Sequence, residues 1–158
     1  MIFATVGTQL AFDRMINVLN DWAEINPSEK IIAQVGPSNA MFDYLNCHDF
    51  LPPDLSNQYF KDARIIVAHA GMGSVLTALK YHKPIIIFPR KASLGEHRNE
   101  HQLATARWLE KKASIFVAWD EAKLIELLDR SHSLLSGDGF TEYANADLIG
   151  NLAEFINS

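Results

Sequence analysis

Short apolar runs alternate along this chain with stretches whose apolar residues recur at helical spacing. The runs cover residues 2–6, 30–35, 64–68, 84–88 and 114–119. Most of their successive side chains are apolar, which is typical of strands that are buried on both faces. Strands of this kind, each followed by a helix, pack as a parallel sheet with helices on both sides. The sequence therefore predicts an α/β fold.

The helical stretches lie between these runs. The first carries Phe12, Met15, Ile16, Leu19 and Trp22, a spacing that places them on one face of a helix. Further helices are predicted over residues 56–62, 73–81 and 100–111, after Asp120, and over a last stretch with Phe140, Ala144, Leu148, Leu152 and Phe155 that follows the break Gly137-Asp138-Gly139. Ser56 and Asp120 are the expected N-caps.

The remaining segments predict one further short strand and a single domain. A short strand is expected over residues 49–51, ahead of Pro52-Pro53. The last amphipathic helix is expected to pack on the chain's own sheet, because such a stripe is usually part of a core. There is no internal repeat or linker, so residues 1–158 are predicted to form a single domain.

The composition argues against several classes of protein. A net charge of −5 argues against a nucleic-acid binder that works through a basic surface. Cys47 is the single cysteine, so no intrachain disulfide forms, which fits a reducing compartment. No apolar run approaches the roughly 20 residues of a membrane span, and the first residues lack the pattern of a signal peptide. We expect a cytoplasmic protein that reaches a membrane only through a partner.

Three polar or glycine-containing loops follow strands of the predicted sheet. They are Gly7-Thr8-Gln9, the segment His69-Ala70-Gly71-Met72-Gly73-Ser74, and the charged segment 89–102. The carboxyl ends of parallel strands meet at one edge of the sheet, where ligands bind in folds of this type. We therefore expect the three loops to form one site.

The second of these loops carries the most informative chemistry. Gly71 and Gly73 follow a β-branched run and precede a helix, so they allow a ligand to approach the backbone closely. The N–H groups at a helix N-terminus favour an anion such as phosphate, and His69 adds a side-chain donor. The sequence predicts binding of a phosphorylated or nucleotide-linked molecule.

Each loop also has a purely structural interpretation. Gly7-Thr8 then forms only a turn, and His69 bonds to a backbone carbonyl. Gly71 and Gly73 then serve only the packing of a helix on a strand, and the segment 89–102 is a solvated surface. The expected convergence of the three loops favours a binding site over these alternatives.

Several other signatures are missing. The sequence has no P-loop, nucleophile elbow, Asp-x-Asp pair or H-E-x-x-H motif. Leu76 stands where a dinucleotide fingerprint has its third glycine. Arg90 and Lys91 leave an NADP-linked enzyme open, because an arginine accommodates a 2′-phosphate. His97 and His101 are four residues apart, but we expect no metal site.

The chain combines H-A-G-M-G-S at residues 69–74 with G-E-H-R-N-E-H-Q at residues 95–102. This combination resembles the glycosyltransferase family 28 C-terminal domain. The opening segment Thr5-Val6-Gly7-Thr8-Gln9, followed by Phe12-Asp13-Arg14, is similar to the start of the small Alg13-like members, including exopolysaccharide subunits of the PssE/EpsE kind. The resemblance implies a Rossmann-like parallel sheet, equivalent to the C-terminal, donor-binding half of a GT-B glycosyltransferase.

The resemblance also implies roles for the three loops, with the glycines along the diphosphate of a UDP-sugar and part of the charged segment toward the sugar. The implied binding residues are Gly7, Thr8, His69, Gly71, Met72, Gly73, Ser74, Arg90, Asn99 and Gln102. Glu96, His97 and His101 are the candidates for the base that deprotonates an acceptor. No metal or other cofactor is expected, because helix N-termini and backbone N–H groups stabilise the leaving diphosphate. Thr77 departs from the family pattern, since many relatives carry a ribose-binding glutamate there.

A GT-B enzyme needs two such domains, and this chain has room for one. The resemblance therefore implies an Alg14-like, membrane-associated partner subunit. The expected function is that of an inverting UDP-sugar transferase subunit, which adds a hexose or hexuronic acid to a lipid-linked saccharide in exopolysaccharide or capsule synthesis. The alternatives are a non-catalytic nucleotide-sugar-binding subunit and an NADP-linked enzyme.

Overall fold

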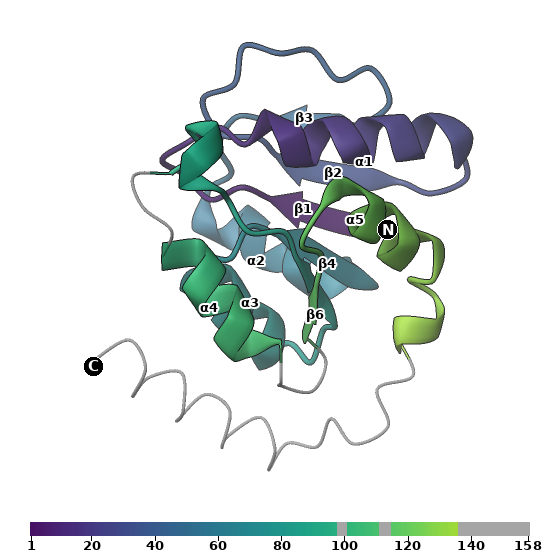
Figure 1. The fold of residues 1–158 in the computed structure, drawn as a ribbon. Helices are drawn as coiled ribbons and strands as arrows, with labels where there is room; N and C mark the ends of the chain where they lie inside the picture. The colour runs from purple at the N-terminus through teal and green to yellow at the C-terminus, as the bar shows by residue number, and fades with distance from the viewer. Residues whose placement is uncertain (98–100, 111–114, 136–158) are drawn as a thin grey trace.

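A computed structural model describes residues 1–97, 101–110 and 115–135 (Figure 1). These residues contain a six-stranded sheet of order β3-β2-β1-β4-β5-β6, in which every pairing is parallel. The strands are β1 (Ile2–Thr5), β2 (Ile31–Gln34), β3 (Asn46–His48), β4 (Ile65–Ala68), β5 (Ile85–Ile87) and β6 (Ile115–Val117). The order is that of a doubly wound Rossmann-like sheet, and the winding reverses between β1 and β4. The predicted fold class is confirmed.

Helices cover both faces of the sheet (Figure 1). The helices are α1 (Asp13–Ile25), α2 (Pro53–Asp62), α3 (Met72–Lys80), α4 (His101–Leu109) and α5 (Glu121–Asp129), with short 3-10 helices η1 (Ala92–Leu94) and η2 (Ser133–Leu135). The apolar side chains of α1 and α5 pack on one face, and those of α2, α3 and α4 pack on the other. This double cover is the reason that the strands read as continuous apolar runs.

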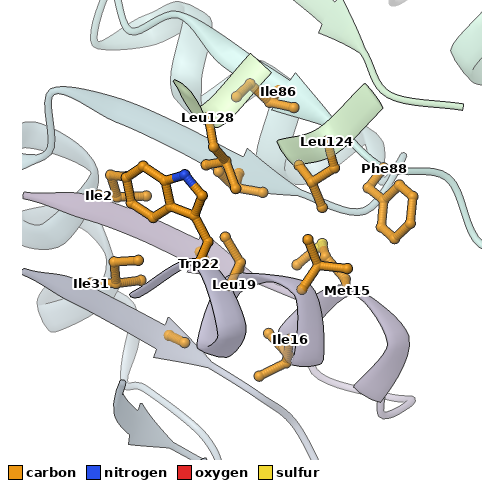
Figure 2. Packing of buried hydrophobic residues seen from close by; sticks show 14 of the residues in the cluster. Ile2, Met15, Ile16, Leu19, Trp22, Ile31, Ile86, Phe88, Leu124 and Leu128 are labelled. Atoms are coloured by element: carbon orange, nitrogen blue, oxygen red, sulfur yellow. The ribbon is translucent and has the colours of Figure 1, made fainter. Parts of the chain in front are cut away.

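The core on the α1 side is shown in Figure 2. Met15, Leu19 and Trp22 of α1 lie against strand residues such as Ile2 and against α5. Phe3, the next residue of β1, packs in the opposite core, because successive strand side chains point to opposite faces. The indole Nε1–H of Trp22 donates to a carboxylate oxygen of Asp129 at 2.9 Å, which ties α1 to α5.

The strand register aligns the ends of the three central strands. Thr5 at the end of β1 pairs with Ala68 at the end of β4, and Ala68 pairs with Ile87 at the end of β5. The loops that follow these strands therefore begin side by side at the carboxyl edge of the sheet. This is the edge at which the sequence predicts a site.

Two predicted boundaries are wrong. The short strand lies at Asn46–His48 rather than 49–51, because this partly exposed edge strand carries polar residues that give no apolar signal. Helix α2 begins at Pro53, and Ser56 lies inside it rather than at its N-cap. A proline is well suited to the first helical position, where the missing N–H has no acceptor to lose.

The N-cap predicted at Asp120 is confirmed, since its carboxylate accepts the Lys123 N–H at 2.8 Å. The last predicted helix, with Phe140, Ala144, Leu148, Leu152 and Phe155, lies outside the described residues. Among the described residues, none of the helices has the length and apolar character needed to cross a membrane.

Candidate functional site

A cavity of about 230 Å³ opens where the loops after β1, β4 and β5 meet. It lies where the winding of the sheet reverses, which is the usual ligand site in such sheets. Its lining consists of Val6, Gly7, Thr8, Gln9, Leu10, His69, Arg90, His97 and Gln102. The structure thus brings together residues from all three loops that the sequence predicts to converge.

The loop after β1 is held by a buried amide that the sequence analysis missed. Gly7 has a positive φ of 80°, which favours glycine. The Gln34 Nε2 donates to the Thr5 hydroxyl at 3.1 Å and to the Gly7 carbonyl at 3.0 Å. Its Oε1 accepts the Leu51 N–H at 3.0 Å. An amide at the end of an otherwise apolar strand is the signal that identifies Gln34 as a structural residue.

Arg90 holds the same loop from the other side. Its side chain is 2% exposed, and its guanidinium donates to four backbone carbonyls. These belong to Val6 (2.6 Å), Ala11 (2.7 Å), Leu10 (2.8 Å) and Glu96 (3.4 Å). Burial lowers the pKa of Arg90, while Glu96 acts in the opposite direction. The structure therefore gives Arg90 a role in shaping the cavity, although the sequence suggested that it binds the ligand.

Glu96 is held in an ion pair with Arg14. The Arg14 guanidinium donates to both Glu96 carboxylate oxygens, at 2.9 and 3.0 Å, and the Lys91 N–H donates to the same carboxylate at 3.0 Å. Burial acts to lower the pKa of Arg14, but its hydrogen bonds to Glu96 and Glu121 raise that pKa overall. The hydrogen bond from Arg14 lowers the pKa of Glu121. The Glu96 carboxylate, paired with Arg14 and the Lys91 N–H, is poorly placed to act as a general base.

His69 lines the cavity and is held by a neighbouring amide. Its Nδ1 is 3.0 Å from Nε2 of Gln102, and the Gln102 Oε1 accepts the Arg90 backbone N–H at 3.0 Å. Burial, together with the nearby Arg90 and His97, lowers the pKa of His69 to about 4. The ring is therefore neutral at physiological pH.

The two glycines before and inside α3 differ in their surroundings. A Cβ on Gly71 would lie 2.5 Å from Nε2 of His69, whereas a Cβ on Gly73 would meet no heavy atom within 4 Å. Gly71 is thus required by the neighbouring imidazole, a reason that the sequence could not supply. Gly73 borders open space, as a ligand-facing glycine should. Met72 and Ser74 lie beside it in the first turn of α3.

The other predicted residues are placed less centrally. Thr8 and His97 line the cavity, whereas His101 is exposed at the start of α4, 3.5 Å from the Thr105 hydroxyl. Asn99 lies outside the described residues. Thr77 donates its hydroxyl to the Gly73 carbonyl at 2.8 Å, so this hydroxyl is already used within the helix.

No cluster of three or more His, Cys, Asp or Glu side chains suited to a metal ion is found in the described part of the chain. The prediction that the protein works without a metal stays a prediction, which metal addition and removal can test.

The family follows from comparison with known sequences. The profile of the glycosyltransferase family 28 C-terminal domain matches residues 1–137. The chain belongs to this family. The family 28 domain is 29% identical over 129 residues to the UDP-N-acetylglucosamine transferase subunit ALG13 of Mus musculus, and 26% identical over 125 residues to that of Homo sapiens. These matches cover 72% and 73% of this chain but only 10% and 11% of the relatives, so the chain spans about a tenth of their length.

Solved structures share the fold of this family 28 domain. The calicheamicin glycosyltransferase CalG4 superposes with a TM-score of 0.64 at 14% identity, over 94% of this chain and 38% of that one. The solution structure of ALG13 gives 0.56 at 18% identity, over 84% and 85% of the two chains. The glycosyltransferase VinC in complex with dTDP gives 0.53 at 19% identity, over 92% and 35%. The sheet is equivalent to the C-terminal half of a GT-B glycosyltransferase.

Proposed function

We propose that this family 28 domain binds the donor of a UDP-sugar glycosyltransferase, with the diphosphate in the cavity beside Gly7 and His69. The observation that carries the proposal is the charge of the cavity wall. Among the described residues that line it, Arg90 and His97 can carry positive charge and none is a carboxylate, although the whole chain has a net charge of −5. The N-terminus of α3 begins next to His69, and its N–H groups add to the attraction for an anion.

The relatives support this assignment of the ligand. The curated relatives are named as UDP-N-acetylglucosamine transferase subunits, and VinC, which shares the fold, was solved with the nucleoside diphosphate dTDP. The sequence suggested a hexose or a hexuronic acid as the donated sugar, and the names of the relatives add N-acetylglucosamine. We propose a UDP-linked sugar of one of these classes as the donor.

The acceptor and the partner belong to the same proposal. We propose a lipid-linked saccharide as the acceptor, as in exopolysaccharide or capsule synthesis of the PssE/EpsE kind. An Alg14-like membrane-associated subunit would supply the facing domain and hold this chain at the inner face of the membrane. Inversion at the sugar and independence of a metal ion complete the proposed reaction.

A non-catalytic role for this chain is the second candidate, and one observation favours it. The Glu96 carboxylate is committed to Arg14 and to the Lys91 N–H, and His101 is exposed and does not line the cavity. Among the three proposed bases, His97 alone borders the cavity. In this second candidate the partner supplies the base that deprotonates the acceptor, whereas in the first candidate His97 supplies it.

The NADP-linked alternative is not retained. It depended on Arg90 and Lys91 as ligands for a 2′-phosphate. The Arg90 guanidinium donates to four backbone carbonyls instead, and the chain belongs to a glycosyltransferase family.

Calorimetry with UDP, UDP-glucose, UDP-galactose, UDP-glucuronate, UDP-N-acetylglucosamine and NADP tests the ligand. We expect UDP and at least one UDP-sugar to bind, and we expect EDTA to leave the affinity unchanged. His69→Ala should weaken binding about ten-fold or more, the usual effect of removing a hydrogen bond to a charged group. His132→Ala removes an exposed histidine beyond α5 and is the matched control. Failure of the wild-type chain to bind any uridine nucleotide would refute the proposal.

The partner is tested by assaying transfer to membrane acceptors, using the chain alone and the chain co-expressed with its membrane subunit. We expect turnover only from the pair, because one domain cannot enclose an acceptor or exclude water from the reacting atoms. Full turnover by the isolated chain would contradict the two-subunit proposal. Among variants of the active pair, loss of turnover with unchanged donor affinity in His97→Ala would assign the base to this chain. Retained turnover in that variant would assign it to the partner.

A further inference from the structure

Gln102 has one possible orientation of its amide. The Arg90 backbone N–H lies 3.0 Å from one end of this amide, and a backbone N–H can only donate, so this end is the oxygen Oε1. Arg90 cannot easily shift, because its buried side chain is fixed by the carbonyls described above. The amide of Gln102 is itself 5% exposed. Its Nε2 therefore points at Nδ1 of His69, 3.0 Å away.

This orientation determines which nitrogen of His69 carries the proton. An amide NH₂ has hydrogens to donate and does not accept, so Nδ1 of His69 must present its lone pair. A neutral imidazole has one proton, and that proton must then reside on Nε2. Burial, with Arg90 and His97 nearby, lowers the pKa of His69 to about 4 and keeps the ring neutral at physiological pH. The hydrogen-bond chain from the Arg90 N–H through the Gln102 amide to His69 thus ends at the Nε2–H of the imidazole.

The Nε2 edge of the ring lies beside Gly7 and Gly71, neither of which has a side chain to cover it. Nε2 lies 3.0 Å from the position of a Cβ on Gly7 and 2.5 Å from that of a Cβ on Gly71. His69 and Gly7 both line the cavity. No acceptor for this hydrogen is found within residues 1–97, 101–110 and 115–135. The donor is therefore available to a ligand that lies over the glycines.

We propose that Gln102 is a positioning residue, which holds His69 as the Nε2–H tautomer so that the imidazole donates to the diphosphate of the nucleotide sugar. The inference rests on the proposed function and deepens it. It also changes the role implied by the family resemblance, which counts Gln102 among the residues that bind the donor directly. An imidazole with its proton on Nδ1 would instead present a lone pair to the phosphate oxygens, and two acceptors repel each other.

Two substitutions separate positioning from simple structural support. Gln102→Leu removes the donor to Nδ1 and leaves both tautomers accessible. Gln102→Glu keeps an acceptor for the Arg90 N–H but presents only acceptors to Nδ1, so it draws the His69 proton to Nδ1. The nearby carboxylate also raises the pKa of His69. Gln58→Glu makes the same chemical change on the exposed surface of α2, where the Gln58 amide donates to the Asp62 carboxylate, and it is the matched control.

The first measurement is nitrogen NMR of the full chain labelled at histidine, which reports the protonation of each ring nitrogen directly. The proposal expects His69 to carry its proton on Nε2 in the wild type and in Gln58→Glu, and on Nδ1 in Gln102→Glu above neutral pH. A wild-type ring protonated on Nδ1 would overturn the proposal. This measurement needs no ligand, and the spectrum also shows whether each variant is folded. It therefore tests the tautomer of His69 even in a variant that binds weakly.

The second measurement is the affinity for UDP-N-acetylglucosamine between about pH 5.5 and 8. Its diphosphate is esterified at both ends, so it lacks the terminal phosphate that titrates near pH 6. The charged or titratable described groups that act on His69 are Arg90 and His97, and these are the same in all variants. Differences between the pH profiles therefore report His69 together with the carboxylate that Gln102→Glu places against it.

We expect a closely similar profile for wild type and Gln58→Glu. In Gln102→Glu the affinity should fall about ten-fold or more near pH 8. It should recover as the pH falls, since the doubly protonated ring again donates from Nε2. Gln102→Leu should lose less and follow the wild-type profile. Unchanged affinity and profile in Gln102→Glu would overturn the positioning role, whereas absence of UDP and UDP-sugar binding by the wild type would overturn the proposed function itself.

Discussion

Replacing Gly71 by alanine should destabilise the protein through His69. The new Cβ would lie 2.5 Å from Nε2 and 3.1 Å from Nδ1 of the imidazole, and closer still to Cε1. Side-chain carbons do not approach other atoms this closely, so either the ring or the backbone must move. The ring is not free to swing away, because its Nδ1 is bonded to the buried amide of Gln102.

The size of the effect follows from what the movement breaks. Overpacking of this kind costs about 1–3 kcal/mol, and leaving the buried Gln102 amide without its acceptor costs about 1–3 kcal/mol more. We therefore expect the free energy of unfolding of Gly71→Ala to fall by about 2–6 kcal/mol. For a domain of this size, each 1 kcal/mol lowers Tm by about 2–4 °C, so Tm should fall by about 4–24 °C.

Gly73→Ala is the matched control. It lies two residues further on, in the first turn of α3, where a Cβ meets nothing within 4 Å. Alanine is about 0.5–1 kcal/mol better than glycine within a helix, so the stability of this variant should be unchanged or slightly higher. Urea unfolding, followed by circular dichroism, measures the free energy of unfolding of both variants. Equal stabilities for the two variants would refute the argument that a side chain at position 71 collides with the His69 imidazole.

Three further outcomes are expected. His69 binds a proton near pH 6.5 when unfolded but only near pH 4 when folded, so the free energy of unfolding should fall by about 2–3 kcal/mol as the pH drops from 6.5 to about 4.5. In urea titrations, His69→Asn should lack this part of the pH dependence. An identical pH dependence in the two proteins would contradict the lowered pKa of His69. Arg90→Met should lower the free energy of unfolding by at least about 3 kcal/mol, because several carbonyls lose their donor, whereas the exposed Arg107→Met should have little effect. Thr77→Glu restores the carboxylate of the family pattern. Calorimetry should show a several-fold gain in affinity for UDP and no gain for dTDP, which lacks one ribose hydroxyl. Equal gains for both nucleotides would show that the new carboxylate does not act through the ribose.

The sheet and the order of its central elements could be predicted because burial on both faces leaves a clear pattern. Ile2–Thr5 and Ile65–Ala68 are wholly buried, and nothing but apolar side chains or satisfied polar groups is tolerated there. The edge strand Asn46–His48 lacks this pattern, since it is only partly covered. The sequence therefore predicts this strand a few residues too far along the chain.

The position of the site was predictable for a related reason, but the role of each side chain was not. The topology of a parallel sheet determines where loops converge, so Gly7 and His69 could be expected to meet. A sequence does not show which acceptors surround a given donor. The sequence alone therefore favours anion binding by Arg90 and a base role for Glu96. In the structure Arg90 donates to backbone carbonyls and Glu96 pairs with Arg14.

The hydrogen bonds of Arg90 also constrain the order in which the protein can fold. They join residues that are 79, 80 and 84 positions apart, and contacts of such long range form late because closing the intervening loop costs entropy. A chain emerging from the ribosome completes the loop after β1 long before residue 90 appears. Local helices can form in this interval, but the binding cavity must wait until the fifth strand has joined the sheet.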